Sequence, residues 1–242
     1  MEAIGIIPAR FASTRFPGKP LVDIGGKPMV QRVYEQSMKA RSLSGVFIAT
    51  DDKRIYDAVV GFGGQAIMTS ENCVNGTERC AEALEHLNGH FAEVVVNIQG
   101  DEPFIQPEDI DNLVSCFADK DVHISTLVKR FVNQADFENP SRVKAVVDDF
   151  MVALRFKRNL QSPFSIDHPQ VFHHVGLYAF RVSVLAELVK IKPTANELNE
   201  NLEQLRWLDN AYRIKCVETN HEAWSVDTPE DLERIQLLLK KS

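Results

Sequence analysis

A short apolar run that passes directly into a cation-rich loop is the feature that most limits how this chain can fold. Residues 4–7, Ile-Gly-Ile-Ile, are long enough for a buried strand, and Pro8 is predicted to end it because proline donates no hydrogen bond to a sheet. Open α/β sheets bind ligands where loops leave the carboxyl ends of their strands. Small residues let backbone N–H groups approach an anion, and Arg and Lys neutralise its charge. The loop contains the small residues Ser13, Thr14 and Gly18 and the cationic residues Arg10, Arg15 and Lys19. This composition favours a triphosphate cradle over the alternative, a solvated basic loop.

Two common phosphate-binding motifs are absent from the sequence. Gly26-Lys27 is followed by Pro28, and no glycine stands five positions before Gly26, so the chain has no P-loop. The dinucleotide-binding run G-x-G-x-x-G is also missing. The loop therefore predicts neither a P-loop ATPase nor a standard dinucleotide-binding fold.

Composition restricts the class of protein further. The 242 residues are 44% apolar, which suits one domain with a large core, or one domain with a lobe. A net charge of −7 argues against nucleic-acid binding, so an anionic ligand has to meet a local basic patch. The four cysteines are scattered without a C-x-x-C pair, which predicts free thiols in a reducing compartment. With no long apolar stretch, the sequence predicts a cytoplasmic protein that does not bind membranes.

Strands and helices alternate through the first half of the chain. Predicted strands cover residues 4–7, 46–49, 66–68 and 93–100, and predicted helices cover 29–40, 53–60, 78–87 and 107–117. Thr77 is the expected N-cap of the third helix. This order is typical of a parallel sheet with helices on both faces.

The second half of the chain is predicted to be richer in strands. Residues 122–131 and 172–180 each form a strand, and residues 142–148 pair with 151–156 as a hairpin. A single helix is expected over residues 197–209, followed by a strand over 214–217. Because adjacent strand residues point to opposite faces, His173 and His174 do not chelate one metal ion.

Two aspartates stand at positions that local structure alone does not require. Asp101 follows the strand at 93–100, whose continuous apolar run predicts a central position at the ligand edge of the sheet. Asp227 stands just before a predicted final helix that ends near residue 239. Thr228 as N-cap, Pro229 at the first helical position and Asp231 three residues after the cap account for the start of that helix.

The loop sequence P-A-R-x-x-S-T-R-x-P-G-K-x-L resembles the signature loop of the 3-deoxy-manno-octulosonate cytidylyltransferases (CMP-Kdo synthetases). Further matches are Gly76-Thr77-Glu78-Arg79, the segment Asn-Ile-Gln-Gly-Asp-Glu-Pro that ends in Pro103, and Trp-Ser-Val-Asp-Thr-Pro-Glu-Asp-Leu that ends in Leu232. The resemblance implies a single cytidylyltransferase domain over residues 1–242. Its expected fold is a three-layer, doubly wound, mostly parallel α/β sheet of the nucleotide-diphospho-sugar transferase type. A small β-rich lobe at about 130–180 is expected to serve dimerisation and sugar binding.

The activity implied by the resemblance is transfer of CMP from CTP to the anomeric hydroxyl of 3-deoxy-D-manno-octulosonate (Kdo), for lipopolysaccharide synthesis. It implies Mg²⁺ as cofactor, CTP and a 3-deoxy sugar acid as partners, and a homodimer. The metal ligands are then Asp101 and Asp227, and the catalytic residues are Lys19, Arg10, Arg15 and Asp101. CTP-binding residues are Pro8, Ala9, Arg10, Ser13, Arg15, Lys19, Gly76, Thr77 and Arg79. Sugar-binding residues are Gln99, Arg158, His174, Glu203 and Gln204.

The sequence departs from the family pattern at three places, one of which is the linker at residues 159–170, shorter than in many relatives. Cys73, Val74 and Asn75 stand where relatives usually carry His-Pro-Ser, and Lys157 stands where they usually carry Ser. Three alternatives therefore stay open. They are a cytidylyltransferase for another sugar acid, of the 8-amino-Kdo or sialic acid type, a purine- or uridine-sugar pyrophosphorylase, and a non-catalytic nucleotide-binding protein.

Overall fold

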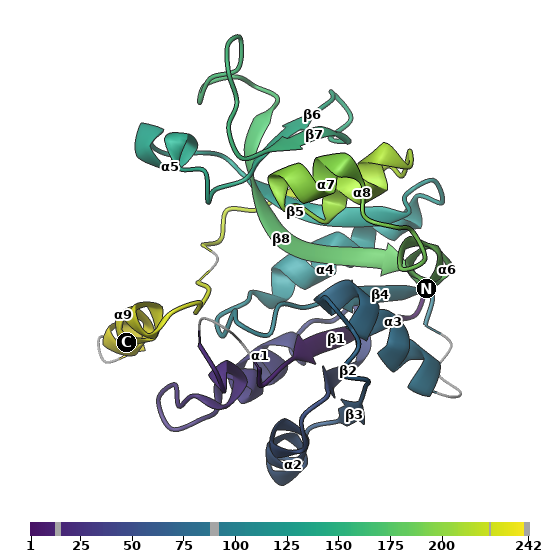
Figure 1. The fold of residues 1–242 in the computed structure, drawn as a ribbon, viewed down its shortest axis with the longest axis vertical. Helices are drawn as coiled ribbons and strands as arrows, with labels where there is room; N and C mark the ends of the chain where they lie inside the picture. Colours follow the sequence, from purple (N-terminus) through teal and green to yellow (C-terminus); the bar gives the residue numbers. More distant parts are fainter. Residues whose placement is uncertain (13–15, 88–91, 223, 240–242) are drawn as a thin grey trace. The chain divides into compact units, whose positions relative to one another are not determined.

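The computed structural model describes residues 1–12, 16–87, 92–222 and 224–239, and it forms two compact units (Figure 1). Unit 1 comprises Met1–Asp111 and Glu222–Ser242, and unit 2 comprises Asn112–His221. The predicted β-rich region at 130–180 lies within unit 2.

Unit 1 is built on a parallel sheet. Its strands are β1 (Ala3–Ala9), β2 (Leu43–Thr50), β3 (Ala66–Met68) and β4 (Val94–Asn97), arranged in the order β3-β2-β1-β4. The chain moves outward from β1 to β2 and β3 and then returns to place β4 on the other side of β1. The topological switch point therefore lies between β1 and β4, which is where open α/β sheets bind ligands.

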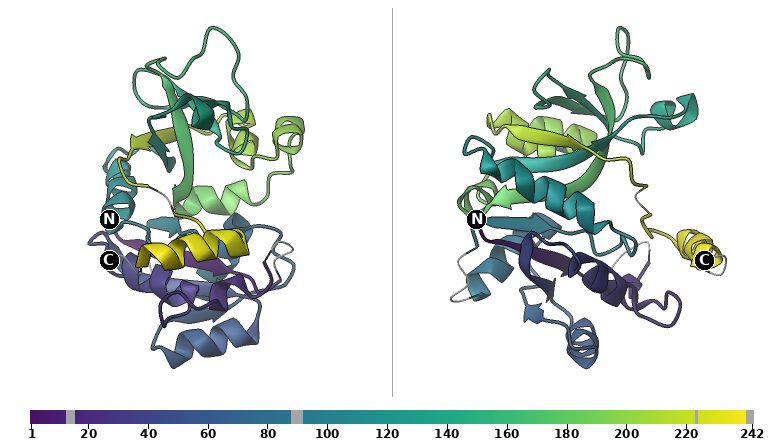
Figure 2. Two further views of the ribbon diagram at one scale, coloured as in Figure 1. Left: turned by 90° about the vertical axis from the view of Figure 1, so that its left-hand side faces the viewer. Right: turned by 180° about the vertical axis from the view of Figure 1, so that it is seen from behind.

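The helices of unit 1 follow from this strand order. They are α1 (Met29–Ser37), α2 (Lys53–Gly61) and α3 (Gly76–His86). Right-handed crossovers in opposite directions place α1 and α3 on opposite faces of the sheet, as Figures 1 and 2 show. The helix α4 (Pro107–Ser115) follows β4, and a 3₁₀ turn, η2 (Cys116–Ala118), follows α4. The α/β order predicted for this part of the sequence is confirmed.

Three local predictions in unit 1 are wrong. Pro8 does not end β1, because β1 pairs with β4 only through Ile6 and continues beyond it along β2 alone, an edge position that tolerates proline. The N-cap of α3 is Asn75 rather than Thr77, and its side chain accepts a hydrogen bond from the Glu78 backbone N–H. The first helix ends at Ser37, three residues earlier than expected.

The chain returns to unit 1 through its last helix, α9 (Pro229–Leu239), which can be followed in Figure 2. The predicted capping box is confirmed, since the Asp231 N–H donates to Thr228 Oγ1 and the Thr228 N–H donates to Asp231 Oδ2. Val226 and Ile235 form a buried cluster with Ile24 and Met29, which ties this returning segment to the region before α1.

Unit 2 contains five strands among its described residues. They are β5 (Ile124–Lys129), β6 (Lys144–Val147), β7 (Ala153–Lys157), β8 (Val171–Arg181) and β9 (Ile214–Glu218). The strand β5 pairs with β8 in antiparallel and with β9 in parallel orientation. The predicted hairpin is the antiparallel pair β6 and β7, and β6 also pairs with β8.

The predicted helix at 197–209 is two helices, α7 (Ala195–Glu200) and α8 (Gln204–Asp209). Asn201 separates them in the left-handed conformation, with φ of 51°. Leu202 and Leu205 are buried, but Leu198 in α7 is 69% exposed, so the regular spacing of leucines in this stretch does not mark one continuous buried helix. Two short helices were not predicted, α5 (Gln134–Glu138) and α6 (Val182–Leu188).

No helix within the described residues is long and apolar enough to cross a membrane. All four cysteines are free thiols, and three of them are buried.

Candidate active site

The carboxyl ends of β1 and β4 open into a cavity of about 470 Å³ at the switch point of unit 1. Its lining residues are Pro8, Ala9, Arg10, Ala12, Lys19, Pro20, Gly76, Gln99, Gly100 and Asp101. Seven of these were predicted as site residues from the sequence. Ala12, Pro20 and Gly100 were not, although all three lie in the segments that carry the resemblance. Ser13 and Arg15, also predicted to bind CTP, lie outside the described residues, as does Thr14.

Two glycines let the backbone segments around the cavity approach one another. A Cβ on Gly100 would lie 2.8 Å from the carbonyl oxygen of Pro8, and one on Gly76 would lie 3.1 Å from Cγ of Pro8. A glycine at this position could serve the close approach of a ligand. In the structure it allows close approach of the β4 exit to the end of β1.

Lys19 stands at the centre of the charged part of the site. It begins the 3₁₀ turn η1 (Lys19–Leu21), preceded by Gly18 in the left-handed conformation with φ of 72°. The Lys19 ammonium lies 2.7 Å from Asp101 Oδ2 and 3.3 Å from Asp227 Oδ1. Two carboxylates separated by 126 residues in the chain thus meet at one ammonium. Lys19 is 15% exposed, against 26% for Asp101 and 37% for Asp227, so the ion pairs lie at the rim of the site rather than in the core.

The returning segment before α9 delivers Asp227 to this position. The Val226 N–H donates to the Asp101 carbonyl oxygen at 2.9 Å, which joins the two aspartate segments through the backbone. On the other side, the Asp227 N–H donates to Asp231 Oδ2 at 3.1 Å. The backbone of Asp227 is therefore held from both directions, and its carboxylate faces Lys19.

Glu102 adds a third acidic group beside Asp101. Burial, and then the carboxylates of Asp101 and Asp109, raises the pKa of Glu102 to about 8. At neutral pH this side chain is mostly uncharged, so it adds little negative charge to the Lys19 cluster.

The donor set at Lys19 fits a magnesium ion that shares its coordination with a nucleotide. No group of three or more His, Cys, Asp and Glu side chains suited to a metal exists among the described residues. Mg²⁺ binds proteins through one or two carboxylates and takes its other ligands from phosphates and water. Asp101 and Asp227 supply two partly exposed carboxylates that already share one cation, the Lys19 ammonium.

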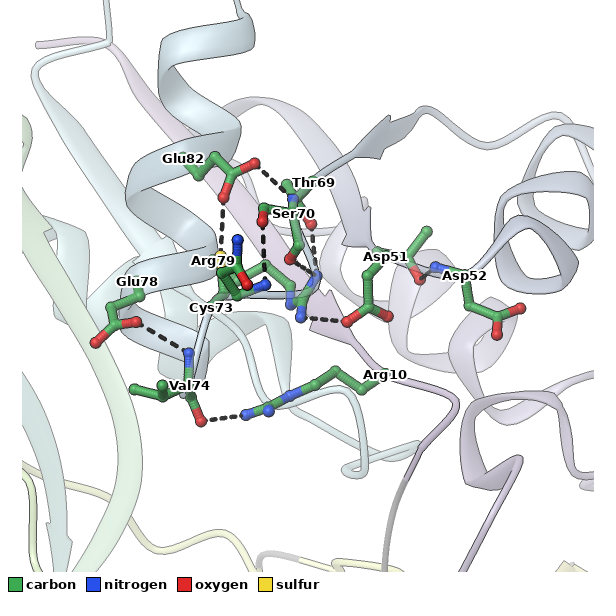
Figure 3. Close-up of polar contacts among 12 residues, drawn as sticks. Arg10, Asp51, Asp52, Thr69, Ser70, Cys73, Val74, Glu78, Arg79 and Glu82 are labelled. Atoms are coloured by element: carbon green, nitrogen blue, oxygen red, sulfur yellow. Dashed lines mark hydrogen bonds and ion pairs between the residues drawn. The ribbon is translucent and has the colours of Figure 1, made fainter.

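Arg10, which lines the cavity, contacts the loop before α3 (Figure 3). Its Nη2 donates to the Val74 carbonyl oxygen at 2.7 Å, and the Val74 N–H donates to Glu78 Oε2 at 2.9 Å. Arg10 is thus attached to a loop that the first turn of α3 holds in place.

Arg79 and Glu82 hold the remainder of that loop from within (Figure 3). Arg79 has no exposed side-chain surface, and it lies 2.6 Å from both Asp51 Oδ2 and Thr69 Oγ1. It therefore joins the carboxyl ends of β2 and β3, and it does not present its guanidinium to the cavity. Asp51 was not predicted as a site residue, although its place at the carboxyl end of a parallel strand was the signal that could have found it.

Cys73 is one of the residues at which this chain departs from the family pattern, and it holds the loop before α3 through a hydrogen bond. Its Sγ donates to Glu82 Oε2 at 2.9 Å, and the Ser70 N–H donates to Glu82 Oε1 at 2.5 Å. Burial, and then the hydrogen bond to Glu82, raises the pKa of the Cys73 thiol to about 11, so it stays protonated at neutral pH. In this chain Cys73 and Asn75 fix the loop geometry through α3 itself.

The predicted sugar-binding residues fall in both units. Gln99 lines the cavity of unit 1. In unit 2, Arg158 donates to the carbonyl oxygens of Glu200, Asn201 and Pro140. Gln204 is buried at the start of α8, and Glu203 is its half-buried N-cap residue.

His174 is a buried, hydrogen-bonded histidine of β8. Its Nε2 lies 3.1 Å from Thr126 Oγ1, and its ring packs against those of Phe156 and Tyr178. Burial, and then the nearby His173, lowers the pKa of His174 to about 3, so the ring is neutral.

Comparison with known proteins places the chain among the cytidylyltransferases. Residues 4–215 match the family described as cytidylyltransferase. The 3-deoxy-manno-octulosonate cytidylyltransferase of Parabacteroides distasonis is 49% identical, over 97% of this chain and 96% of its own length. The protein of the same name from Geobacter sulfurreducens is 47% identical, over 99% of this chain and 100% of its own length. A solved structure of CMP:2-keto-3-deoxy-manno-octonic acid synthetase complexed with CTP superposes with a TM-score of 0.93 at 37% identity, covering 100% of this chain and 99% of that one.

Proposed function

The chain belongs to the family of 3-deoxy-manno-octulosonate cytidylyltransferases, and from this premise we propose that it transfers CMP from CTP to the anomeric hydroxyl of Kdo and releases diphosphate. The relatives that support this assignment align over nearly the whole length of both chains. Its doubly wound, mostly parallel sheet is that of the nucleotide-diphospho-sugar transferases, and the CTP-complexed relative has the same fold.

The arrangement of charged side chains around Lys19 assigns the proposed function to particular residues. Lys19 lies between Asp101 and Asp227, at the carboxyl edge of a parallel sheet and beside a cavity with Arg10 on its wall. A nucleoside triphosphate needs cations for its phosphates and carboxylates for the metal ion that accompanies them. Both kinds of group converge at this place.

In the reaction, the anomeric hydroxyl releases its proton to water as its oxygen forms a bond to the α-phosphorus, and the bond from that phosphorus to the oxygen of the β-phosphate breaks. Negative charge develops on the departing diphosphate. Lys19 and Arg10 bind the β- and γ-phosphates and stabilise that charge, because both carry fixed positive charge before the reaction starts. Arg15 belongs to this set by its place in the same loop. Gly76 and Thr77, at the start of α3, supply the helix N-terminus that faces the nucleotide.

Asp101 and Asp227 would hold Mg²⁺, which when bound neutralises phosphate charge and lowers the pKa of the sugar hydroxyl. The two aspartates also fix the Lys19 ammonium when the nucleotide is absent. We assign no side chain as a general base.

Fewer observations bear on how the sugar acid binds than on how CTP binds. Gln99 lines the nucleotide cavity and is the side chain best placed to meet a sugar beside CTP. Arg158, His174, Glu203 and Gln204 belong to the proposal through the resemblance. The expected readout for an Arg158→Lys variant is a raised KM for Kdo with an unchanged KM for CTP.

The compartment and assembly state are further parts of the proposal. Free thiols at all four cysteines suit a reducing cytoplasm. A homodimer is expected from the resemblance, and light scattering on the purified chain measures it.

The decisive experiment is diphosphate release from CTP with a panel of sugar acids, with and without Mg²⁺. The proposal predicts Mg²⁺-dependent release with Kdo that exceeds release with 8-amino-Kdo or sialic acid. GTP, ATP and UTP should give little release. A preference for another sugar acid or another nucleotide would reject the specific assignment, and no release with any pair would reject catalysis.

A further inference from the structure

A cluster of side chains in unit 1 lies beside the proposed catalytic residues but takes no part in the proposed reaction. It begins at the N-cap of α2. The Asp52 side chain accepts hydrogen bonds from the backbone N–H of Arg54 at 2.9 Å, from Arg54 Nε at 2.9 Å and from Arg54 Nη2 at 2.6 Å. A carboxylate that binds both edge nitrogens of a guanidinium fixes the orientation of its plane. Arg54 is therefore held in one orientation although its side chain is 61% exposed.

The face of this guanidinium lies on an aromatic ring of the phosphate-binding loop. Arg54 Cζ is 3.3 Å from the centroid of the Phe11 ring, close enough for a cation–π contact. Phe11 directly follows Arg10 in the chain, and its ring is half-buried. The pair thus joins the first turn of α2 to the chain segment that leaves β1.

The same ring contacts the residue that precedes Lys19. A Cβ on Gly18 would lie 3.1 Å from Cζ of Phe11, close enough that the ring would have to shift by a few tenths of an ångström, and the φ of 72° at Gly18 separately favours glycine. The Gly18 N–H also donates to the Phe11 carbonyl oxygen at 2.9 Å. Phe11 therefore sets the position of Gly18 through its ring and through its backbone.

We propose that Arg54 and Phe11 are positioning residues for Lys19. Arg54, oriented by Asp52, holds the Phe11 ring against Gly18, and this fixes the backbone from which Lys19 reaches the triphosphate. The inference rests on the proposed function, because it assigns Lys19 to the phosphates of CTP. Neither Arg54 nor Phe11 is among the residues that line the cavity, so neither is placed to contact the nucleotide there directly.

The test compares Arg54→Ala, Phe11→Leu and the double variant with two controls. Lys53→Ala is the matched control, because it removes a positive charge from the neighbouring position of α2, where Lys53 pairs with Asp57 four residues later. Phe11→Tyr is the conservative control that keeps the ring. Arg54→Ala retains the backbone hydrogen bond to Asp52 and hence the helix cap. Melting temperatures show that each variant is folded.

Two readouts are needed, which are CTP affinity by calorimetry without sugar, and KM and kcat from diphosphate release with CTP and Kdo. We expect Arg54→Ala and Phe11→Leu each to weaken CTP binding and raise KM for CTP about fivefold, the scale of one cation–π contact. The double variant should lose no more than either single variant, because each change breaks the same contact. KM for Kdo should stay unchanged, and Phe11→Tyr and Lys53→Ala should remain within twofold of the unsubstituted chain.

Two results would overturn the inference. One is an Arg54→Ala variant that matches Lys53→Ala in CTP affinity. The other is a double variant whose losses multiply to about 25-fold, since Arg54 would then meet the nucleotide independently of the ring. Failure of the proposed function is a separate result. In that case the unsubstituted chain would release no diphosphate with Kdo, but the CTP affinities of the variants would still test the positioning role.

Discussion

Two aspartates four residues apart are predicted to have separable roles, one in catalysis and one in stability. Asp227 faces Lys19 at 3.3 Å, whereas Asp231 Oδ2 accepts hydrogen bonds from the Asp227 N–H, the Thr228 N–H and Thr228 Oγ1. Changing either residue to Asn removes the same charge and keeps nearly the same shape. Asp227→Asn and Asp231→Asn are therefore matched controls for each other.

The expected magnitudes follow from these contacts. In Asp227→Asn the pair with Lys19 is lost, but an ion pair this exposed contributes only about 0.2–1 kcal/mol to stability. The cost to the transition state is expected to be larger, because the Asp227 carboxylate is also proposed to hold Mg²⁺. Turnover should fall about 100-fold, which corresponds to about 2.7 kcal/mol.

Asp231→Asn should have the opposite profile. Burial works to raise the pKa of Asp231, but the backbone N–H groups of Asp227 and Thr228 outweigh it and hold the pKa below its ordinary value. The charged form is thus the one that stabilises the fold. Losing it at a helix N-terminus should cost about 1 kcal/mol of the free energy of unfolding and lower the melting temperature by about 2–4 °C.

The assay measures diphosphate release at 25 °C with saturating CTP, Kdo and Mg²⁺, alongside thermal unfolding of the same samples. We expect Asp227→Asn to lose turnover while its melting temperature stays nearly unchanged, and Asp231→Asn to lose melting temperature while most turnover remains. Turnover within threefold of the unsubstituted chain for Asp227→Asn would refute the reasoning. Equal losses of turnover in both variants, at unchanged melting temperature, would refute it as well.

Four further predictions address other parts of the molecule. Asp101→Asn should reduce turnover by roughly 100-fold in a folded protein, and near-normal Mg²⁺-dependent activity would contradict its role. Lys19→Ala should weaken CTP binding, so an unchanged CTP titration would exclude Lys19 as a phosphate ligand. His174, with a pKa lowered from 6.5 to about 3, takes up a proton below about pH 6 only when the chain unfolds. The free energy of unfolding should therefore fall by up to about 1.4 kcal/mol for each unit by which the pH is lowered from 6 to 4. Urea unfolding of His174→Gln at several pH values should show that its free energy of unfolding depends less steeply on pH. Arg206→Met should cost about 3–5 kcal/mol because it leaves Glu197, 12% exposed, without its 2.6 Å ion pair, and a second change, Glu197→Leu, should recover much of that loss.

Local sequence signals predicted most of the α/β scaffold because they report on short-range physics. The run Val94–Asn97 is apolar enough to require burial on both faces, and the strand β4 is found there. Thr228 and Asp231 formed the predicted capping box because that motif needs only residues three positions apart. The predicted strand at 66–68 matches β3 residue for residue.

One local error occurred where a distant segment changed the outcome, and another where residue spacing did not reveal a break in a helix. Pro8 stays within β1 because β4 ends its pairing at Ile6, a fact about register that the sequence around Pro8 does not contain. The helix predicted at 197–209 breaks at Asn201, while an ion pair from Arg206 to Glu197 still joins its two halves. Apolar spacing alone does not show whether one helix or two cover this stretch, and α7 has no buried residue.

By itself, the sequence determined the family, the order of strands and helices in the first half of the chain, and the types of residue that line the cavity of unit 1, because motifs and periodicities are properties of neighbouring residues. Only the tertiary structure decided that Asp101 and Asp227 share the Lys19 ammonium, since this depends on the burial of Val226 and Ile235 with Ile24 and Met29. It also decided that Arg79, in a motif that suggested nucleotide contact, is turned inward to Asp51. Charge and spacing indicate what a side chain could bind, but the packing of segments distant in sequence determines which way that side chain faces.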